Sequence, residues 1–283
     1  MNILTVDVEE WFHLLDHDLT KDKGSWSSHE VRIHKNLERI LTILENTDTK
    51  ATFFVLGWIA KKYPDVIKTL LEMNYDIGSH SFYHELVYHQ NKLSFKKDVE
   101  YSIKTIEDIS GKSVKYFRAP GFSITEQNLW AFDVLLELGI EIDCSIFPAR
   151  HSHGGFPSYG KSSPAIIEIN GSKLKQLPIS FFSILNYPVV FSGGGYFRLF
   201  PYRIIKYLSK DTDYLMSYIH PRDLDPGQPI VPNLSVARRF KSYVGLGRAE
   251  KKLTKWLIET EFIDVSTAND QIDWATQRTI KIR

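Results

Sequence analysis

The sequence has little cysteine, no surplus of charge of either sign and no long apolar run. Its 283 residues include one cysteine, Cys144, so an intramolecular disulfide framework is excluded and a reducing compartment suits the chain. The 35 Lys and Arg residues balance 34 Asp and Glu residues at a net charge of +1, which provides no overall field to attract nucleic acid. No stretch approaches the roughly 20 apolar residues that a membrane span needs.

The N-terminus does not resemble a signal peptide. The apolar run at Asn2–Val8 is too short, and acidic residues interrupt it before any cleavage site. Without such a signal or a membrane span, we expect a cytoplasmic protein. Hydrophobic residues make up 43% of the chain, which is enough for a sizeable core and argues against disorder.

Strand-like and helix-like segments alternate along the first half of the chain. The predicted strands are Asn2–Val8, Ala51–Leu56, Tyr75–Ser79, Lys115–Arg118 and Ile140–Asp143. The predicted helices are Val31–Glu45, Pro64–Met73, Phe95–Ser110 and a segment that begins at Ser123 and ends at Gly139. Short connections between alternating strands and helices favour a parallel sheet, and they predict an α/β fold of the (β/α) barrel type.

Three local signals set the ends of these helices. Pro64 occupies a first-turn position, and Ser94 is expected to cap the helix that Gly111 ends. Ser123 and Glu126 have the spacing of a capping box, which predicts a helix start there.

The pattern changes at about Phe147. Residues 147–212 are rich in glycine, proline and aromatic residues, and we expect this elaborated segment to build a substrate groove. The predicted elements after it are a strand at Tyr214–Ile219, helices at Val236–Tyr243 and Ala249–Glu259, and a last strand near Phe262–Val265. We therefore expect one domain over residues 1–283, with residues 147–212 as an insertion and residues 235–283 as C-terminal helices and last strand.

Within the elaborated segment, one run of glycines and one pair of histidines stand out. Tyr196 directly follows three glycines, and we expect it to line the groove because glycines permit a tightly turned backbone. His151 and His153 lie beside another glycine pair, where a structural role in the loop is expected.

Three acidic residues follow the first predicted strand. In the stretch TVDVEEWF, strand alternation puts Asp7 and Glu9 on one side and Glu10 on the other. In parallel α/β barrels, functional residues lie at the C-terminal ends of strands. A solvated strand end is the structural alternative for these carboxylates.

Two histidines follow the third predicted strand. His80 and His84 are four residues apart, so a helical turn would place them on one face, where they could share a metal ion. Together with a carboxylate from the first strand they would make a three-ligand site with open positions, which is the pattern of catalytic zinc sites.

Two further strand ends carry polar groups. The run Arg118-Ala-Pro-Gly-Phe122 offers an arginine that can pair with a buried carboxylate and a turn whose backbone N–H groups can face an oxyanion. His220 follows the strand at Tyr214–Ile219, and Asp143 ends another strand from which it could orient that histidine. A structural arginine, a tight turn and a structural histidine are the alternatives.

Taken together, these segments resemble the NodB-type polysaccharide deacetylases, carbohydrate esterase family four. The resemblance covers roughly residues 2–145 and 213–266, and it includes the stretch Lys50-Ala-Thr-Phe-Phe-Val-Leu-Gly57. The segments Phe147–His151 and Gly193–Arg198 resemble a subgroup associated with exopolysaccharide synthesis. The resemblance implies a distorted (β/α) barrel, in agreement with the alternation of strands and helices.

The resemblance also implies roles for the residues at each motif position. Asp7 matches the general base and Arg118 the arginine that holds it. His80 and His84 match the two histidine ligands of the metal.

The remaining motif positions concern the oxyanion and the acid. The backbone of Gly121 or Phe122 matches the oxyanion contact. His220 matches the general acid, and Asp143 matches the partner of that acid.

One position departs from the common family pattern. Many members have aspartate where this chain has Val8, which cannot bind a metal ion. Some members have an acid-x-acid pattern instead, and Asp7-Val-Glu9 fits that version. Glu9 is therefore the expected third ligand, and Glu10 is the alternative.

We accordingly expect a metal-dependent hydrolase, with Zn²⁺ or another divalent transition metal, that removes N-acetyl groups from an amino sugar of a polysaccharide or its precursor. Its partner would be an amino-sugar glycan or glycan precursor and not nucleic acid. Two alternatives stay open: a metal-independent cyclic amide or imide hydrolase of the same fold, and a non-catalytic carbohydrate-binding member of a glycan-synthesis complex, which Val8 favours.

Overall fold

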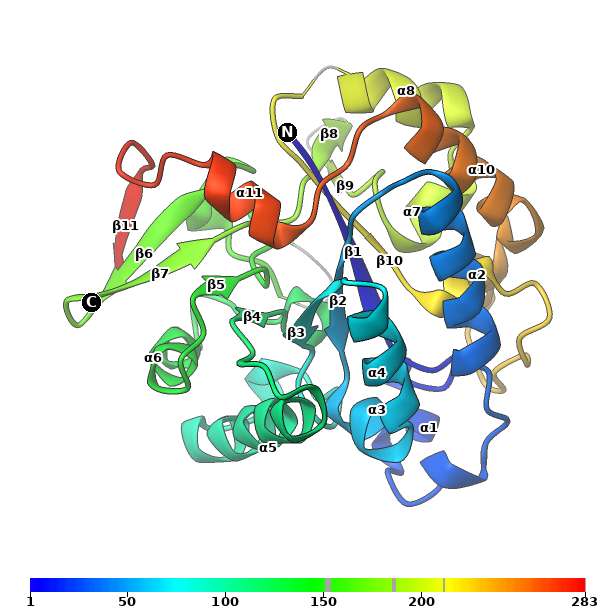
Figure 1. The fold of residues 1–283 in the computed structure, drawn as a ribbon, viewed down its shortest axis with the longest axis horizontal. Helices are drawn as coiled ribbons and strands as arrows, with labels where there is room; N and C mark the ends of the chain where they lie inside the picture. Colours follow the sequence, from blue (N-terminus) through cyan, green and yellow to red (C-terminus); the bar gives the residue numbers. More distant parts are fainter. Residues whose placement is uncertain (151–153, 185–186, 211, 283) are drawn as a thin grey trace.

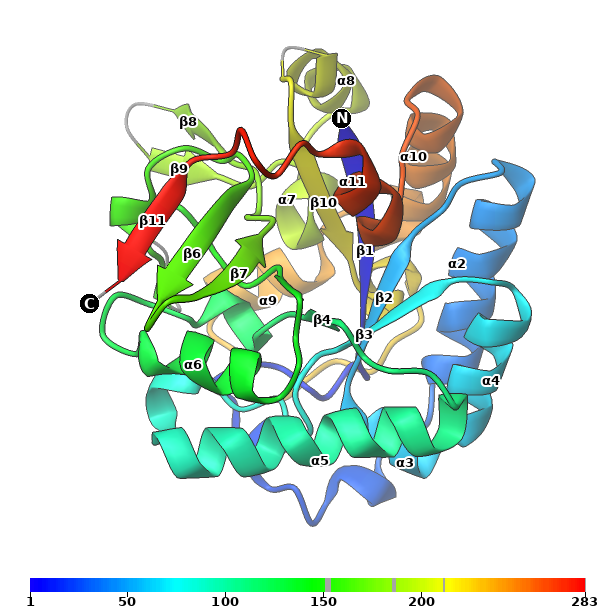
Figure 2. The ribbon, with the colours of Figure 1, turned by 60° about the vertical axis from the view of Figure 1, so that its left-hand side comes forward.

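A mostly parallel sheet with helices along its outside organises the molecule (Figures 1 and 2). The computed structural model describes residues 1–150, 154–184, 187–210 and 212–282. The elements of the first half are β1 (Asn2–Val8), α1 (Asp18–Lys21), α2 (Ile33–Asn46), β2 (Thr52–Val55), α3 (Gly57–Lys62), α4 (Pro64–Glu72), β3 (Asp76–Ser79), α5 (Lys92–Ser110), β4 (Tyr116–Phe117), α6 (Trp130–Glu137) and β5 (Ile142–Asp143).

The second half contributes both strands and helices. Its elements are β6 (Ala165–Ile169), β7 (Ser172–Gln176), β8 (Phe182–Ile184), β9 (Tyr187–Val189), α7 (Gly194–Leu199), α8 (Tyr202–Lys210), β10 (Leu215–Ile219), α9 (Val236–Tyr243), α10 (Leu246–Glu259), α11 (Val265–Gln271) and β11 (Thr279–Ile282). Within the described residues, nine strands form one sheet in the order β10-β1-β2-β3-β4-β5-β7-β6-β11, while β8 and β9 pair separately.

The strand β1 is buried on both faces, as its near-continuous apolar sequence predicts for a parallel strand. It pairs in parallel with β10 on one side and with β2 on the other. Figure 1 shows α2, α3, α4 and α5 following one another along the outer side of β1 to β4. The side chains on this outer side form the larger of the apolar clusters.

A second apolar cluster fills the inner side of the curved sheet. Ile3 of β1, Phe54 of β2, Ile142 of β5 and Met216 of β10 all belong to it, although β5 is not a neighbour of the other three strands. Side chains from separated strands meet because the sheet curls around them, which is the arrangement of a distorted (β/α) barrel. The predicted fold class is confirmed.

The helix start predicted at Ser94 differs in the structure. Asn91 is the N-cap of α5, and its side chain accepts a hydrogen bond from the Ser94 N–H at 2.9 Å. Ser94 lies in the first turn, where its hydroxyl accepts from the Asn91 N–H at 3.0 Å, so the two residues form a reciprocal box. The predicted end of this helix is confirmed, because Gly111 is the C-cap residue of α5 and adopts φ = 66°.

The capping box predicted at Ser123 is wrong. The Ser123 hydroxyl donates to the carbonyl of Pro120 and accepts from the Val87 N–H, and Glu126 accepts from the Ser158 N–H. Both side chains are used by tertiary contacts, so the helix α6 begins later, at Trp130.

The C-terminal region also departs from the prediction. Ile263 makes a single bridge to Ile3, and the chain then enters α11, because the Asp264 side chain caps that helix by accepting from the Thr267 N–H at 2.8 Å. The last strand lies instead at Thr279–Ile282, where it pairs with β6. Residues His151 and His153 lie outside the described residues.

None of the helices in the described part of the chain has the length and apolar character needed to cross a membrane.

Candidate active site

The polar residues predicted at the strand ends gather at one edge of the sheet. A cleft of about 540 Å³ opens there. The predicted residues that line it are Asp7, Glu9, His80, His84, Gly121, Phe122 and His220. Arg118 lies directly beneath Asp7 and is fully buried. Parallel strands explain this convergence, because their C-terminal ends share one edge.

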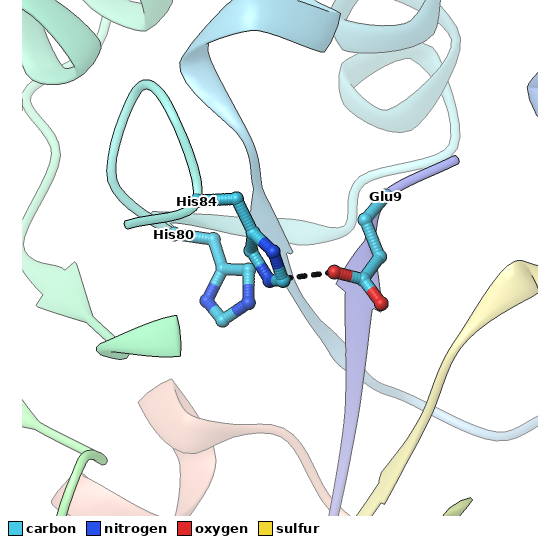
Figure 3. A group of neighbouring side chains, drawn as sticks. All are labelled: Glu9, His80 and His84. Carbon is cyan, nitrogen blue, oxygen red and sulfur yellow. Dashed lines mark ion pairs between the residues drawn. The ribbon is translucent and has the colours of Figure 1, made fainter. Parts of the chain in front are cut away.

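Glu9, His80 and His84 form the candidate metal centre (Figure 3). One ligand atom from each side chain lies within 4.8 Å of the others, and all three residues are buried. Figure 3 shows the Glu9 carboxylate at the end of β1 facing the two imidazoles of the loop after β3. The carbonyl of Arg118 lies 2.8 Å from Nδ1 of His80, which fixes the tautomer and leaves Nε2 free to bind a metal ion.

Glu9 and His84 lie as close together as two side chains that bind the same metal ion. Nε2 of His84 lies 2.6 Å from Oε2 of Glu9, yet this buried oxygen has no hydrogen-bond partner among the described residues. A close contact without hydrogen-bond geometry is what two ligands of one cation would make, and a buried charge needs such a partner. Burial alone would raise the pKa of Glu9, but His84 and His220 outweigh it and lower the pKa to about 2. The donor set of two imidazoles and one carboxylate suits Zn²⁺.

Glu10 is excluded as the third ligand. Its Oε1 accepts hydrogen bonds from the N–H groups of Arg32 at 2.7 Å and Ile33 at 2.8 Å, at the start of α2. Its Oε2 accepts from the Trp11 N–H at 3.2 Å. Glu10 therefore caps a helix, and strand alternation correctly separates it from Glu9.

The two histidines meet through a bend and not through the predicted helical turn. Ser81 and His84 have positive φ angles of 66° and 55°. The Ser81 hydroxyl accepts from the His84 N–H at 3.2 Å, and the Asp98 carboxylate accepts from the N–H groups of Phe82 and Tyr83. Side chains other than glycine at positive φ carry backbone strain, which concentrates at functional sites.

Asp7 is held by Arg118. Nη1 of Arg118 donates to Oδ1 of Asp7 at 2.7 Å and to the Thr5 hydroxyl at 2.6 Å. The guanidinium also lies 4.4 Å from the centre of the Phe54 ring, and Arg118 is fully buried. The predicted contact between Arg118 and Asp7 is confirmed.

His220 pairs with Asp223, a residue that the sequence analysis missed. Nδ1 of His220 lies 3.0 Å from Oδ2 of Asp223, and Nε of Arg198 lies 3.0 Å from Oδ1 of the same carboxylate. Burial alone would lower the pKa of His220, but the charges of Asp223 and Glu9 raise it to about 9. The three-residue spacing between His220 and Asp223 across Pro221 was the signal available in the sequence.

The prediction that Asp143 orients His220 is wrong. Oδ1 of Asp143 accepts from both the N–H and the hydroxyl of Ser145, whose Oγ in turn accepts from the Ala119 N–H at 2.7 Å. Asp143 is fully buried and lies outside the cleft lining, and burial raises its pKa to about 7. Through Ser145 it supports the turn at residues 119–122, and its register partner on β4 is Phe117, which belongs to the outer apolar cluster and not to the cleft.

The turn at Gly121 and Phe122 lines the cleft as predicted. Both residues have positive φ angles, 60° and 53°. The Phe122 N–H already donates to the Ala119 carbonyl at 3.1 Å, so it cannot face an oxyanion, and Gly121 is the better candidate for that contact. The Phe122 ring forms part of the cleft wall and meets the edge of Tyr218 at 5.2 Å between ring centres.

Tyr196 does not line the cleft, in contrast to the prediction. Its ring stacks on Phe200 with 6.0 Å between centres, and Nζ of Lys241 lies 5.1 Å from its centre. The neighbouring Gly194 and Gly195 line the cleft instead. The helix α7 begins at Gly194, so the side chain of Tyr196 is carried away from the centre.

His13 is a further cleft residue that the sequence analysis did not single out. It is buried at 1% exposure, and its Nδ1 accepts a hydrogen bond from the Glu10 N–H at 3.1 Å. This bond leaves the proton of the neutral ring on Nε2. Burial and the nearby His84 lower the pKa of His13 well below its usual value, so a neutral imidazole stands beside the candidate metal centre.

Two family models match consecutive parts of the chain. Residues 18–141 match the polysaccharide deacetylase family, and residues 144–270 match a domain of unknown function, DUF3473. The first segment contains His80, His84 and Arg118, whereas His220 falls in the second. Asp7 and Glu9 precede both segments.

Curated and structural relatives agree with the first match. A peptidoglycan-N-acetylglucosamine deacetylase of Bacillus cereus is 30% identical over 94 residues, which cover 33% of this chain and 34% of that protein. Chitin deacetylase 1 of Saccharomyces cerevisiae is 32% identical over 78 residues, or 28% of this chain and 26% of that protein. The matched region thus spans about a third or less of either relative.

Similarity of fold extends over the whole chain. The structure of a putative polysaccharide deacetylase from Mycobacterium smegmatis matches with a TM-score of 0.66 at 15% identity, covering all of this chain and 94% of that one. A family 4 carbohydrate esterase pseudoenzyme from Bacillus anthracis matches with a TM-score of 0.52 at 13% identity, covering all of this chain and 69% of that one. Residues 18–141 thus resemble the polysaccharide deacetylase family and residues 144–270 resemble DUF3473, and the chain shares the fold of these carbohydrate esterase structures.

Proposed function

We propose that the protein is a metal-dependent N-deacetylase that hydrolyses the acetamido group of an amino sugar. One observation carries this proposal: the Glu9–His80–His84 centre, the Asp7–Arg118 pair and the His220–Asp223 pair face a single cleft. A hydrolytic amidase needs a group that accepts the proton of water and a group that protonates the leaving amine. The two pairs supply these groups on either side of the candidate metal centre.

Glu9, His80 and His84 would hold the metal ion, for which we propose Zn²⁺. When bound, such an ion supplies Lewis acidity, which makes water more acidic and polarises the amide carbonyl. Asp7 accepts the proton of the attacking water. Arg118 keeps the carboxylate of Asp7 in place through the 2.7 Å hydrogen bond from its buried guanidinium.

His220 donates the proton that the departing amine needs. Asp223 accepts from Nδ1 of His220 and leaves Nε2 facing the cleft, 3.6 Å from Oε1 of Glu9. Arg198 holds Asp223 in turn. The N–H of Gly121 would stabilise the oxyanion, and one such donor is typically worth about 3 kcal/mol in other hydrolases.

The substrate class follows from the relatives. The printed names of the matched proteins concern peptidoglycan N-acetylglucosamine and chitin, both of which carry acetamido sugars. We propose an amino-sugar glycan or its precursor as substrate. The association with exopolysaccharide synthesis, the cytoplasmic location and the absence of nucleic-acid partners stay predictions.

Acetate release from N-acetylated oligosaccharides by the zinc-loaded protein tests the proposal. Asp7→Asn and His220→Ala should each reduce the rate by at least about two orders of magnitude, in line with general acid–base catalysis elsewhere. Removal of the metal with a chelator should abolish the activity, and zinc should restore it. Full activity in either variant or in the metal-free protein would contradict the mechanism.

A non-catalytic carbohydrate-binding role is the second candidate, because a structural relative from Bacillus anthracis is a pseudoenzyme. Val8 in this chain is fully buried and holds no ligand position, which gave this alternative its support. Glycan binding without acetate release, in the zinc-loaded protein at any pH between about 5 and 10, would favour it.

A further inference from the structure

The helix α9 forms one wall of the cleft and brings unpaired positive charge to it. Arg238 and Lys241, one turn apart on this helix, line the cleft together with Ser235 at the helix N-cap and Ser242. Nothing in the proposed reaction uses these residues. Their position beside the centre raises the question of what they bind.

The acidic side chains of the cleft already have partners. Asp7 pairs with Arg118, Asp223 with Arg198, and Glu9 with His84. A divalent ion on Glu9 would add further positive charge. The carboxylates of the cleft are therefore not available to neutralise the positive charges of Arg238 and Lys241 on α9.

The cations of α9 lack such partners. In the part of the chain that the structure describes, no carboxylate oxygen lies within 4.0 Å of the charged nitrogens of Arg222, Arg238 or Lys241, all of which line the cleft. Arg238 donates to the backbone carbonyls of Leu15 and Asp16, and Arg222 donates to that of Trp11. These acceptors are neutral, so no direct ion pair within the described residues offsets the charges of Arg238 and Lys241, even though the whole chain has a net charge of only +1.

The surroundings of Lys241 show the effect of positive charge gathered on α9. The Lys241 ammonium lies 5.1 Å from the centre of the Tyr196 ring. Burial and the neighbouring Arg238 lower the pKa of Lys241. An anion beside Lys241 would relieve both effects.

The helix is also fixed relative to the catalytic residues. Arg198, which holds Asp223, donates to the carbonyls of Lys241, Ser242 and Val244 at the C-terminal end of α9, at distances of 2.9 to 3.0 Å. One guanidinium thus joins the partner of His220 to the backbone that carries Lys241. A group bound at Lys241 would have a defined position relative to the reacting acetamido group.

We propose that the substrate carries an anionic group, a carboxylate or a phosphate, which Lys241 and Arg238 bind while its acetamido group lies at the Glu9–His80–His84 centre. This inference rests on the proposed function and specifies the substrate class. A cleft of about 540 Å³ has room for a short glycan segment that places both groups.

Three disaccharides of equal size test the proposal: neutral N,N′-diacetylchitobiose, its 1-phosphate, and N-acetylglucosaminyl-glucuronic acid. Their dissociation constants are measured by calorimetry on the zinc-loaded Asp7→Asn protein, in which turnover is slow. At low salt at least one charged disaccharide should bind about tenfold more tightly than the neutral one, as a partly buried ion pair would require. The preference should shrink as salt increases, and the better of the two charged disaccharides identifies the anion.

Lys241→Gln tests the site and Arg239→Gln is its matched control. Arg239 lies on the same helix but does not line the cleft, so both variants remove one charge from α9. Lys241→Gln should reduce the preference to about twofold or less, whereas Arg239→Gln should retain it. Equal binding of the neutral and charged disaccharides would overturn the proposal. An equal loss of the anionic preference in Lys241→Gln and Arg239→Gln would also overturn it, and would indicate that α9 attracts anionic surfaces in general.

Acetate release by the wild-type protein separates this inference from the proposed function. Anionic preference without acetate release from any disaccharide would support the subsite and contradict the deacetylase proposal. Acetate release without anionic preference would support the deacetylase and contradict the subsite.

Discussion

The His220–Asp223 pair sets the pH range in which the cleft holds a protonated imidazole. Asp223 and Glu9 raise the pKa of His220 to about 9, so the acid form persists from low pH up to that value and is lost above it. Asp223→Asn removes one of these charges and should lower the pKa. The alkaline limb of the pH–rate profile should therefore move to lower pH by about one unit or more.

The control for this prediction is Asp143→Asn. Asp143 bonds to Ser145 and not to His220, so its variant should leave the alkaline limb in place. Rates are measured from about pH 5 to 10 with acetate release as the readout. If the alkaline limb moved in Asp143→Asn and stayed in place in Asp223→Asn, the pairing of His220 with Asp223 would be wrong.

The two adjacent glutamates provide a matched test of the metal centre. Glu9→Gln weakens a charged ligand and should lower zinc affinity by at least about tenfold, measured by competition with a chromophoric chelator. Glu10→Gln should leave zinc affinity close to that of the wild type, because the Glu10 carboxylate bonds to the backbone N–H groups of Trp11, Arg32 and Ile33. Its effect should be a loss of about 1 kcal/mol in the free energy of unfolding.

Equal loss of zinc affinity in both glutamate variants would contradict the assignment of Glu9 as the ligand. Since the readout is equilibrium binding, it does not depend on finding a substrate.

At the level of elements, Gly193 shows why the glycine run of the middle segment is needed. A Cβ atom at Gly193 would lie 2.2 Å from Cε1 of Tyr218 and 2.8 Å from its carbonyl oxygen, where the chain forms a bridge to β10. Gly193→Ala should therefore cost about 1–3 kcal/mol of unfolding free energy, as overpacking does. It should also disturb β10 immediately before His220.

Gly247→Ala is the control for Gly193→Ala. Gly247 lies in the first turn of α10, and a Cβ there would meet nothing within 4 Å. Alanine should be neutral or stabilise the protein by up to about 1 kcal/mol, because it has the higher helix propensity. Chemical denaturation measures both changes. Equal stability of the two variants would show that β10 and Gly193 are less closely packed than the structure indicates.

The elements that the sequence predicted well are those with a strong local signal. The apolar run of β1, the Pro64 start of α4 and the Gly111 end of α5 depend on nearby residues, and all three were predicted correctly. The start of α6 was not, because Ser123 and Glu126 form tertiary hydrogen bonds to residues far along the chain.

The same distinction holds for the site. Strand alternation and the spacing of His80 and His84 predicted that Glu9, His80 and His84 lie together as a candidate metal centre, since each motif lies within a few residues. The family resemblance implied Asp143 as the partner of His220. The structure shows instead that Asp223, in the short helix η5 (Pro221–Leu224), pairs with His220. Arg198 was likewise missed, because its partners lie 25 residues or more away along the chain.

At the level of the whole molecule, the two segments matched by different family models build a single sheet. β1 pairs with β10 over the register Asn2–Val6 to Leu215–Ile219, and β5 pairs with β7, so the strands that flank residues 18–141 both pair with strands of residues 144–270. The catalytic cleft is divided in the same way, because the candidate metal ligands precede residue 144 and His220 and α9 follow it. Neither segment has a complete sheet or a complete cleft alone.

This division predicts that residues 1–143 do not fold as an independent unit. Without β10, the strand β1 would expose an unpaired, apolar edge, and Arg118 would lose the cover of Met216. The fragment should therefore show no cooperative thermal transition and no measurable zinc affinity, although it contains Glu9, His80 and His84. Deletion of residues 279–283 is the matched control: it removes the edge strand β11, whose residues are at least partly exposed, and keeps Arg278 on Tyr159, so the shortened protein should melt cooperatively and bind zinc. A cooperative transition with zinc binding in the 1–143 fragment would instead mean that the deacetylase segment is a domain in its own right, to which the second segment adds only His220 and the basic wall.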